Sequence, residues 1–227
     1  MQNIIALGWS LAYIAVILGL ATLIARYSKG ASETSRKFVH ILVGNWVFIS
    51  LLFTELWAIL IVPFSFIIIN SLSMKYNLIS AMERKDDSFG TVYYAVSIFA
   101  LSGLGFITGW KMLPIVGLLT MAYGDGFAAI TGKRWGKVKP FSFAPDKSLV
   151  GSLTVAIAAI VSTLLGIYVF TDTSIVSEQS ILKILLIALS NGIFASLIEL
   201  TGSRGSDNIS LPIGTGVFAT LSFYFGD

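Results

Sequence analysis

Long apolar runs follow one another along the chain, separated by short polar segments. A helix needs about 20 apolar residues to cross the roughly 30 Å hydrocarbon core of a bilayer, and most runs approach that length. They cover residues 3–25, 38–54, 56–73, 91–108, 112–131, 149–170, 181–200 and 209–225. The pattern predicts an all-α protein with about eight transmembrane helices, in which "FTEL" joins the second and third as a tight hairpin.

Composition supports a membrane protein. Hydrophobic residues make up 56% of the 227 residues and charged residues only 12%, against about a quarter in soluble domains. The chain contains no cysteine, which excludes disulfides, thiolate metal sites and cysteine nucleophiles. We find no internal repeat and no long linker, so we expect one membrane domain over residues 1–227. The net charge of +3 gives no reason to expect a nucleic-acid partner.

The distribution of lysine and arginine predicts the topology, because these residues collect in cytoplasmic loops. If the amino terminus is outside, of the 15 cations only Lys111 and Lys183 fall in outside loops. Eight spans then place both termini outside and most of the polar residues on the cytoplasmic face. The first run follows no basic segment, so we expect a retained anchor rather than a cleaved signal. In a prokaryote the protein would lie in the cytoplasmic membrane.

Asp125 lies inside the predicted span 112–131, between Gly124 and Gly126. It is about seven residues from the cytoplasmic end of that span, hence on the order of 10 Å deep. A carboxylate at such a depth is costly and is a functional-site candidate by default. The flanking glycines let a ligand approach the backbone or let the helix open locally. The alternative is that Asp125 pairs with a lysine of a neighbouring helix and only fixes their packing.

The loop after this span, "TGKRWGKVKPFSFAPDKSLVGS", has the residue types of a polyphosphate site. Its cations can neutralise phosphate oxygens, and the amides in the first turn of the next helix attract anions. It is not a Walker sequence. The alternative is that the cations only set the topology and touch anionic headgroups. The residues concerned are Gly132, Lys133, Arg134, Gly136, Lys137, Lys139, Lys147, Ser148, Gly151 and Ser152.

Three further polar residues surround the last inside loop, "ELTGSRGSDNISLP". Glu199 ends one predicted span, and Asp207 and Asn208 precede the next, so their side chains can converge with Asp125 at one depth. Mg²⁺ is commonly held by one or two carboxylates together with substrate phosphates. We therefore predict a magnesium site at Asp125, Glu199 and Asp207. As an alternative, Asp207 and Asn208 form an ordinary turn or helix cap.

His40, the only histidine, follows "RKFV" at the cytoplasmic start of the second span. It is a candidate to orient an acceptor hydroxyl or to contact phosphate, or else it is an interfacial anchor. Arg36 and Lys37 are candidate headgroup or phosphate contacts. Thr91 and Tyr94 are candidates to line the site, although tyrosine is enriched at membrane interfaces in any case.

These patches resemble, in order along the chain, the CTP-dependent lipid-alcohol kinases, which include phytol and farnesol kinases, dolichol kinase and the yeast-type diacylglycerol kinase. The matching stretches are "RKFVHILVG", "GTVYY", "GDGFAAITGKRWGK" with "KSLVGS", and "SDNISLP". The likeness to phytol kinases is the strongest. The resemblance implies nucleotide and metal binding by Gly124, Asp125, Gly126, Gly132, Lys133, Arg134, Gly136, Lys147, Gly151, Ser152, Asp207 and Asn208.

The resemblance implies a membrane kinase that transfers the γ-phosphate of CTP, or of another nucleoside triphosphate, to the hydroxyl of a lipid alcohol, with Mg²⁺ as cofactor. The catalytic candidates are Asp125, Lys147, Asp207 and His40. Phosphatidate cytidylyltransferases share some of these elements, but Asp146 and Val150 stand where they carry Lys and Glu. A secondary transporter is the other alternative, although the carboxylates gather towards one face rather than the midplane.

Overall fold

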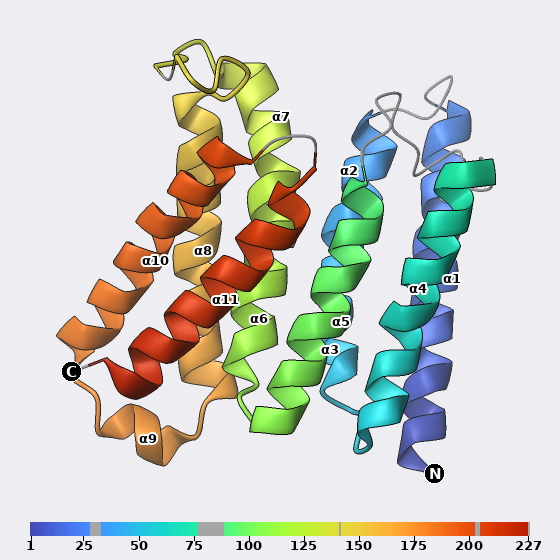
Figure 1. Cartoon of the computed structure of the whole chain (residues 1–227), viewed down its shortest axis with the longest axis horizontal. Helices are drawn as coiled ribbons and strands as arrows, with labels where there is room; N and C mark the ends of the chain where they lie inside the picture. Colours follow the sequence, from blue (N-terminus) through green and yellow to red (C-terminus); the bar gives the residue numbers. More distant parts are fainter. Residues whose placement is uncertain (28–32, 77–88, 141, 203–204, 227) are drawn as a thin grey trace.

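The computed structural model describes residues 1–27, 33–76, 89–140, 142–202 and 205–226, and the regular structure in these ranges is helical. Figure 1 shows the helices packed side by side. Their bounds are α1 Gln2–Tyr27, α2 Glu33–Gly44, α3 Trp46–Ser50, α4 Leu56–Tyr76, α5 Gly90–Thr108, α6 Met112–Leu119, a π-helix Thr120–Asp125, α7 Gly126–Trp135, α8 Leu149–Phe170, α9 Thr173–Ser177, α10 Ile181–Thr201 and α11 Asp207–Phe225. The all-α prediction is confirmed.

Each predicted apolar run corresponds to one helix or to helices in line. The run 38–54 falls on α2 and α3, which are separated at Asn45, and the run 112–131 falls on α6, the π-helix and α7. Of the helices in the described ranges, only the short helix α9 lies wholly outside the predicted runs. Within the described residues, six helical segments are long and apolar enough to cross a membrane. The segments α2–α3 and α11 fall short of those criteria, so the count of eight spans stays a prediction.

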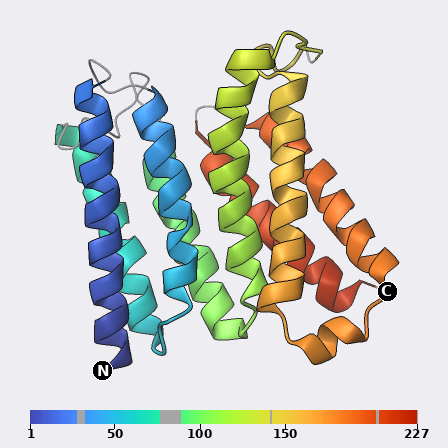
Figure 2. The same ribbon diagram turned by 180° about the vertical axis from the view of Figure 1, so that it is seen from behind.

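The loops of the bundle separate into two ends (Figures 1 and 2). One end, here called the basic end, contains the end of α7, the segments 136–140 and 142–148 and the start of α8. The start of α1, the α5–α6 turn, α9 and the end of α11 lie at the opposite end. Which end faces the cytoplasm, and the placement of both termini outside, stay predictions.

The helix that contains Asp125 is irregular at its centre. Residues Thr120–Asp125 form a π-helix between α6 and α7. Such π segments are rare and occur frequently at functional sites. This π-helix contains Gly124 and ends directly before Gly126. Because α7 continues to Trp135, Asp125 lies ten residues from its end, about 15 Å along the axis rather than the expected 10 Å.

Close contact between α6 and α11 depends on glycine. A Cβ atom on Gly117 would collide with the Pro212 carbonyl oxygen, and one on Gly216 would lie 2.7 Å from the Leu113 carbonyl oxygen. These contacts leave no space for a methyl group. The crossing holds α11, whose first residue is Asp207, against the helix that leads to Asp125.

We predict that Gly117→Ala destabilises the protein by about 1–3 kcal/mol, because the added methyl overpacks the α6–α11 crossing. Thermal unfolding in detergent measures the effect. Gly19→Ala is the matched control, since a Cβ atom there meets nothing within 4 Å and alanine favours the helix. A melting temperature for Gly117→Ala equal to that of Gly19→Ala would contradict the packing argument.

Candidate functional site

Asp125 is paired with two residues of α2. The Lys37 ammonium donates to Asp125 Oδ2 at 2.6 Å and to the Asp125 carbonyl oxygen at 3.2 Å. His40 Nε2 lies 3.5 Å from the same Oδ2. Lys37 and His40 are three residues apart, so they lie on one face of the helix. The neighbouring Gly126 permits this close approach of α2, because a Cβ atom on residue 126 would collide with the Ile41 side chain.

The Lys37–Asp125 pair agrees with the alternative that Asp125 pairs with a lysine of a neighbouring helix. The Lys37 side chain is only 6% exposed and Asp125 20%, so the pair is largely shielded from solvent. A shielded carboxylate requires a compensating cation, which explains why Lys37 contacts Asp125 rather than lipid headgroups. The contact with His40 adds a proton-binding group, which packing alone does not require.

Tyr94 of α5 contacts His40, and Thr91 lies one turn earlier on the same helix. The rings of His40 and Tyr94 stack with centroids 4.3 Å apart, and the Tyr94 hydroxyl donates to the His40 carbonyl oxygen at 3.3 Å. The Thr91 carbonyl oxygen accepts a hydrogen bond from the buried Asn70 amide at 3.1 Å. Tyr94 thus fixes the position of the imidazole. The side chain of Arg36 lies outside the described residues.

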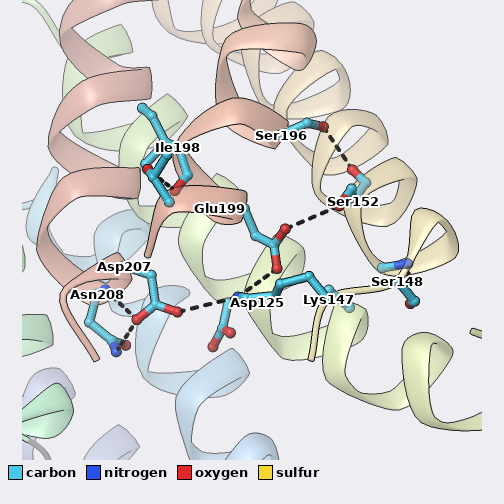
Figure 3. Close-up of polar contacts among 12 residues, drawn as sticks. Asp125, Lys147, Ser148, Ser152, Ser196, Ile198, Glu199, Asp207 and Asn208 are labelled. Carbon is cyan, nitrogen blue, oxygen red and sulfur yellow. Dashed lines mark hydrogen bonds and ion pairs between the residues drawn. The ribbon is translucent and has the colours of Figure 1, made fainter. Parts of the chain in front are cut away.

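A second group, here called the Lys147 cluster, consists of Lys147, Glu199, Asp207 and Ser152 (Figure 3). Lys147 Nζ lies 2.7 Å from Glu199 Oε1 and 3.9 Å from Asp207 Oδ2. Ser152 donates from its hydroxyl to Glu199 Oε2 at 3.2 Å. Three parts of the chain therefore meet at one point: the segment before α8, the end of α10 and the start of α11. Their residues are up to 60 positions apart in the sequence.

The charge of Asp125 acts on Lys147. Burial alone lowers the pKa of Lys147, but the carboxylates of Glu199, Asp207 and Asp125 outweigh it and hold that pKa above its ordinary value. Lys147 therefore stays protonated at neutral pH. Figure 3 shows Asp125 beside Lys147 and Asp207.

Asn208 links Asp207 to the rest of the bundle. Its backbone amide and its side-chain amide both donate to Asp207 Oδ1, at 3.1 and 3.2 Å. The Asn208 carbonyl oxygen accepts from the buried Ser97 hydroxyl at 2.8 Å. Asp207 and Asn208 therefore make the local contacts that the turn or cap alternative expected. The other Asp207 oxygen, Oδ2, faces Lys147.

The start of α8 has fewer available amides than expected. The Ser148 hydroxyl caps the helix by accepting from the Gly151 amide at 3.2 Å. The Leu149 amide donates to the Val138 carbonyl oxygen and the Ser152 amide to that of Ser148, both at 3.0 Å. An anion would therefore have to compete for these three amides. Cations, rather than helix amides, are the stronger phosphate candidates here.

Gly132 and Gly136 bring the end of α7 close to this cap. A Cβ atom on Gly132 would lie 3.0 Å from the Ser148 hydroxyl oxygen, and one on Gly136 would collide with it. Gly124 differs, because its Cβ atom would make only ordinary contacts, the nearest at 3.5 Å to Val155. Packing thus accounts for Gly132 and Gly136, as it does for Gly126.

Lys133 and Arg134 are exposed in the last turn of α7, at the same end of the bundle as Lys147. The Arg134 guanidinium lies 5.0 Å from the centre of the Trp135 ring. Both cations are therefore accessible to a polyanion at this end of the bundle.

The carboxylates fit magnesium in only one way. Across the described parts of the chain, no three His, Asp or Glu side chains are close enough to hold a metal by themselves. Glu199 and Asp207 face the same point, and Asp207 Oδ2 is 3.9 Å from Lys147. This arrangement matches Mg²⁺ binding by one or two carboxylates with nucleotide phosphates as the remaining ligands.

An apolar groove begins at Asp125 and extends among α1, α2, α4 and α5. It encloses about 990 Å³, its open mouth included. Polar groups of Asp125, His40, Asn208, Thr91 and Asn70 line one part of it, and the remainder is lined mainly by aliphatic and aromatic side chains. The groove can therefore bind a molecule that has one polar end and a hydrocarbon tail.

Sequence reasoning did not identify the groove, the pairing of Lys37 with Asp125 or that of Lys147 with Glu199. One available signal was Asn70, a polar residue inside an otherwise apolar run, which the structure buries at 6% exposure. The three-residue spacing of Lys37 and His40 was another, since it places both on one helix face.

Comparison with known proteins supports one family. No family model matches the chain, and no solved structure does. The phytol kinase of Synechocystis sp. is 32% identical over 223 residues, which cover 97% of this chain and 92% of that protein. The probable phytol kinase 2, chloroplastic, of Glycine max is 31% identical, covering 83% and 65% respectively. Phytol kinase 1, chloroplastic, of Arabidopsis thaliana is 28% identical, covering 83% and 66%.

The chain thus spans about two thirds of the length of these two plant proteins and nearly all of the cyanobacterial one. The similarity covers the site, because 97% of the chain is aligned with the Synechocystis protein. The chain therefore belongs to the phytol kinase family, whose members are phosphotransferases that act on an alcohol acceptor.

Proposed function

We propose that the protein is a membrane-embedded kinase that transfers the γ-phosphate of a nucleoside triphosphate to the hydroxyl of a lipid alcohol. The observation that best supports it is the groove that ends at Asp125 and His40, with the Lys147 cluster on the other side of Asp125. The relatives named as phytol kinases make phytol, or a related isoprenoid alcohol, the first acceptor to test. CTP is the proposed donor, on the resemblance to CTP-dependent kinases.

On the acceptor side, the alcohol hydroxyl would lie at the polar end of the groove. Its oxygen attacks the γ-phosphorus, the bond from the γ-phosphorus to the bridging oxygen breaks, and the nucleoside diphosphate leaves. Asp125 takes the hydroxyl proton, and His40, held by Tyr94, orients the hydroxyl. Lys37 compensates the negative charge of Asp125 between turnovers.

On the donor side, Lys147 would bind phosphate oxygens together with Lys133 and Arg134. A lysine ammonium has three donors, so Lys147 can keep its bond to Glu199 and still contact a phosphate. Asp207 and Glu199 would hold Mg²⁺, with Asp125 nearby. The metal, when bound, neutralises charge on the phosphates. Holding donor and acceptor in line supplies most of the remaining catalysis.

The basic end would face the cytoplasm, where nucleotides are available, and residues 1–227 would act as one membrane domain. This orientation follows the excess of cations in the loops at that end. In a prokaryote the protein would lie in the cytoplasmic membrane with both termini outside. Partners other than the donor, the lipid alcohol and the surrounding lipids are not required by the mechanism.

Transfer of labelled phosphate tests the proposal. Purified protein in detergent, supplied with γ-labelled CTP, Mg²⁺ and phytol, is expected to yield labelled lipid phosphate, and removal of Mg²⁺ with EDTA is expected to stop it. ATP, GTP and UTP, each γ-labelled, establish the donor preference. Label that moves only from the α-position of CTP to phosphatidate would indicate a cytidylyltransferase instead. Absence of any transfer, together with solute flux in liposomes, would favour a transporter.

A further inference from the structure

We infer that the apolar groove binds the hydrocarbon tail of the acceptor and that Trp46, Val62 and Ile98 close its far end, so that they select the acceptor by chain length. This inference rests on the proposed function and adds to it a class of substrate, a single-chain alcohol with a tail of limited length.

The positions of polar and apolar residues along the groove determine the orientation of the acceptor molecule. Asn70, Thr91, His40 and Asp125 supply polar groups to one part of the lining, so a hydroxyl is stabilised beside them and not between the apolar walls. Each methylene buried against those apolar walls contributes about 0.8 kcal/mol. A lipid alcohol therefore enters with its tail towards the opposite end of the bundle.

The positions of the lining residues along α4 and α5 give the depth of the groove. On α5 the lining residues run from Gly90 through Ala95 to Ile98, and on α4 they run from Asn70 to Val62. Eight residues separate the first and last lining position on each helix, which corresponds to about 12 Å along the axis. The groove is therefore deep enough to bury part of a long tail but ends inside the bundle.

Trp46 forms a fixed part of the far end. Its side chain is buried at 3% exposure, and its indole N–H donates to the buried Ser10 hydroxyl at 2.9 Å. The ring also packs against Phe53, with centroids 6.3 Å apart. Because Trp46 is held on two sides, a tail cannot easily displace it, and longer tails must bend or protrude.

Two substitutions in α5 change the groove in opposite directions. Ala95→Leu adds three carbons to the wall about one turn below Thr91, and Ile98→Ala removes three at the far end. We expect Ala95→Leu to lower kcat/KM for long alcohols by about fourfold for each methylene displaced, with little effect on short ones. Ile98→Ala is expected to move the optimum to longer chains. Leu104→Ala, on the exposed face of α5, is the matched control.

The measurement is kcat/KM across a series of primary alcohols from hexanol to hexadecanol, with farnesol and phytol added. Thermal unfolding establishes that each variant is folded. An opposite shift of the length profile in the two variants supports the inference. Profiles that are the same as the wild type in both folded variants would overturn it, although the kinase proposal would stand.

A binding readout separates this inference from the proposed function. A long alcohol with bromine at the tail terminus is expected to quench Trp46 fluorescence, and one brominated next to the hydroxyl to quench it less. The Trp46 signal is the difference between the wild type and Trp46→Phe, because the exposed Trp9 and Trp57 contact the detergent. Equal quenching in both proteins would place the tail elsewhere, whether or not label is transferred.

Discussion

Asp125→Asn is expected to lower kcat by about 10²–10⁴-fold while the protein stays folded and inserted, because the amide can no longer accept the proton of the acceptor hydroxyl. The substitution keeps the size of the side chain and leaves an oxygen for the Lys37 ammonium, which is 2.6 Å away. Label transfer from γ-labelled CTP to phytol gives the rate, and thermal unfolding in detergent gives the stability.

A double variant distinguishes chemistry from packing at this position. If Asp125 serves only to neutralise Lys37, Lys37→Met combined with Asp125→Asn removes both charges and should restore stability and activity together. If Asp125 takes part in the reaction, the double variant regains stability but stays inactive. Near-normal turnover in either variant would exclude a catalytic role for Asp125.

Lys147→Met is expected to lower kcat/KM for the nucleotide by about 10²-fold, through a higher KM, a lower kcat or both, because a half-buried cation proposed to bind the phosphates is lost. The pKa of Lys147 is raised by its carboxylate neighbours, so the wild-type side chain is charged throughout the neutral range. Steady-state rates at varied CTP concentration provide the measurement.

Two controls accompany Lys147→Met. Lys139→Met removes the same charge from an exposed position in the same loop, and kinetics close to the wild type are expected. Lys147→Met combined with Glu199→Gln avoids leaving Glu199 buried without its cation, so its thermal unfolding shows how much of any stability lost in Lys147→Met comes from the unpaired carboxylate. If Lys147→Met and Lys139→Met behave alike, the loop acts only as a topological signal.

The fold could be predicted to a large extent because bilayer thickness sets the length of each apolar run. The runs ending near residues 108 and 170 coincide with α5 and α8 to within a residue or two. The π-helix could not be predicted, because the glycines beside Asp125 permit the helix to open but the residues that do so depend on packing against neighbouring helices. The extension of α7 to Trp135 was missed because its last turn is polar, so the apolar run ends earlier than the helix.

The clustering of several candidate residues could be predicted, but their pairing could not. Charge and position pointed to Asp125, Lys147, Glu199 and Asp207, and the structure brings these residues together. Which cation faces which carboxylate depends on how helices pack across the bundle, and a single sequence does not encode that in any local pattern. The groove escaped prediction because its lining is made of the same aliphatic residues as every lipid-facing surface.

The π-helix has a consequence for the angular position of Asp125. An α-helix bonds each amide to the carbonyl four residues earlier and a π-helix to the one five residues earlier, so Thr120–Asp125 turns less per residue than the roughly 100° of a regular α-helix. A regular α-helix over the same residues would point the Asp125 side chain in another direction relative to α2. The type of helix before Asp125, and not only the residues in it, therefore sets where the acidic group points.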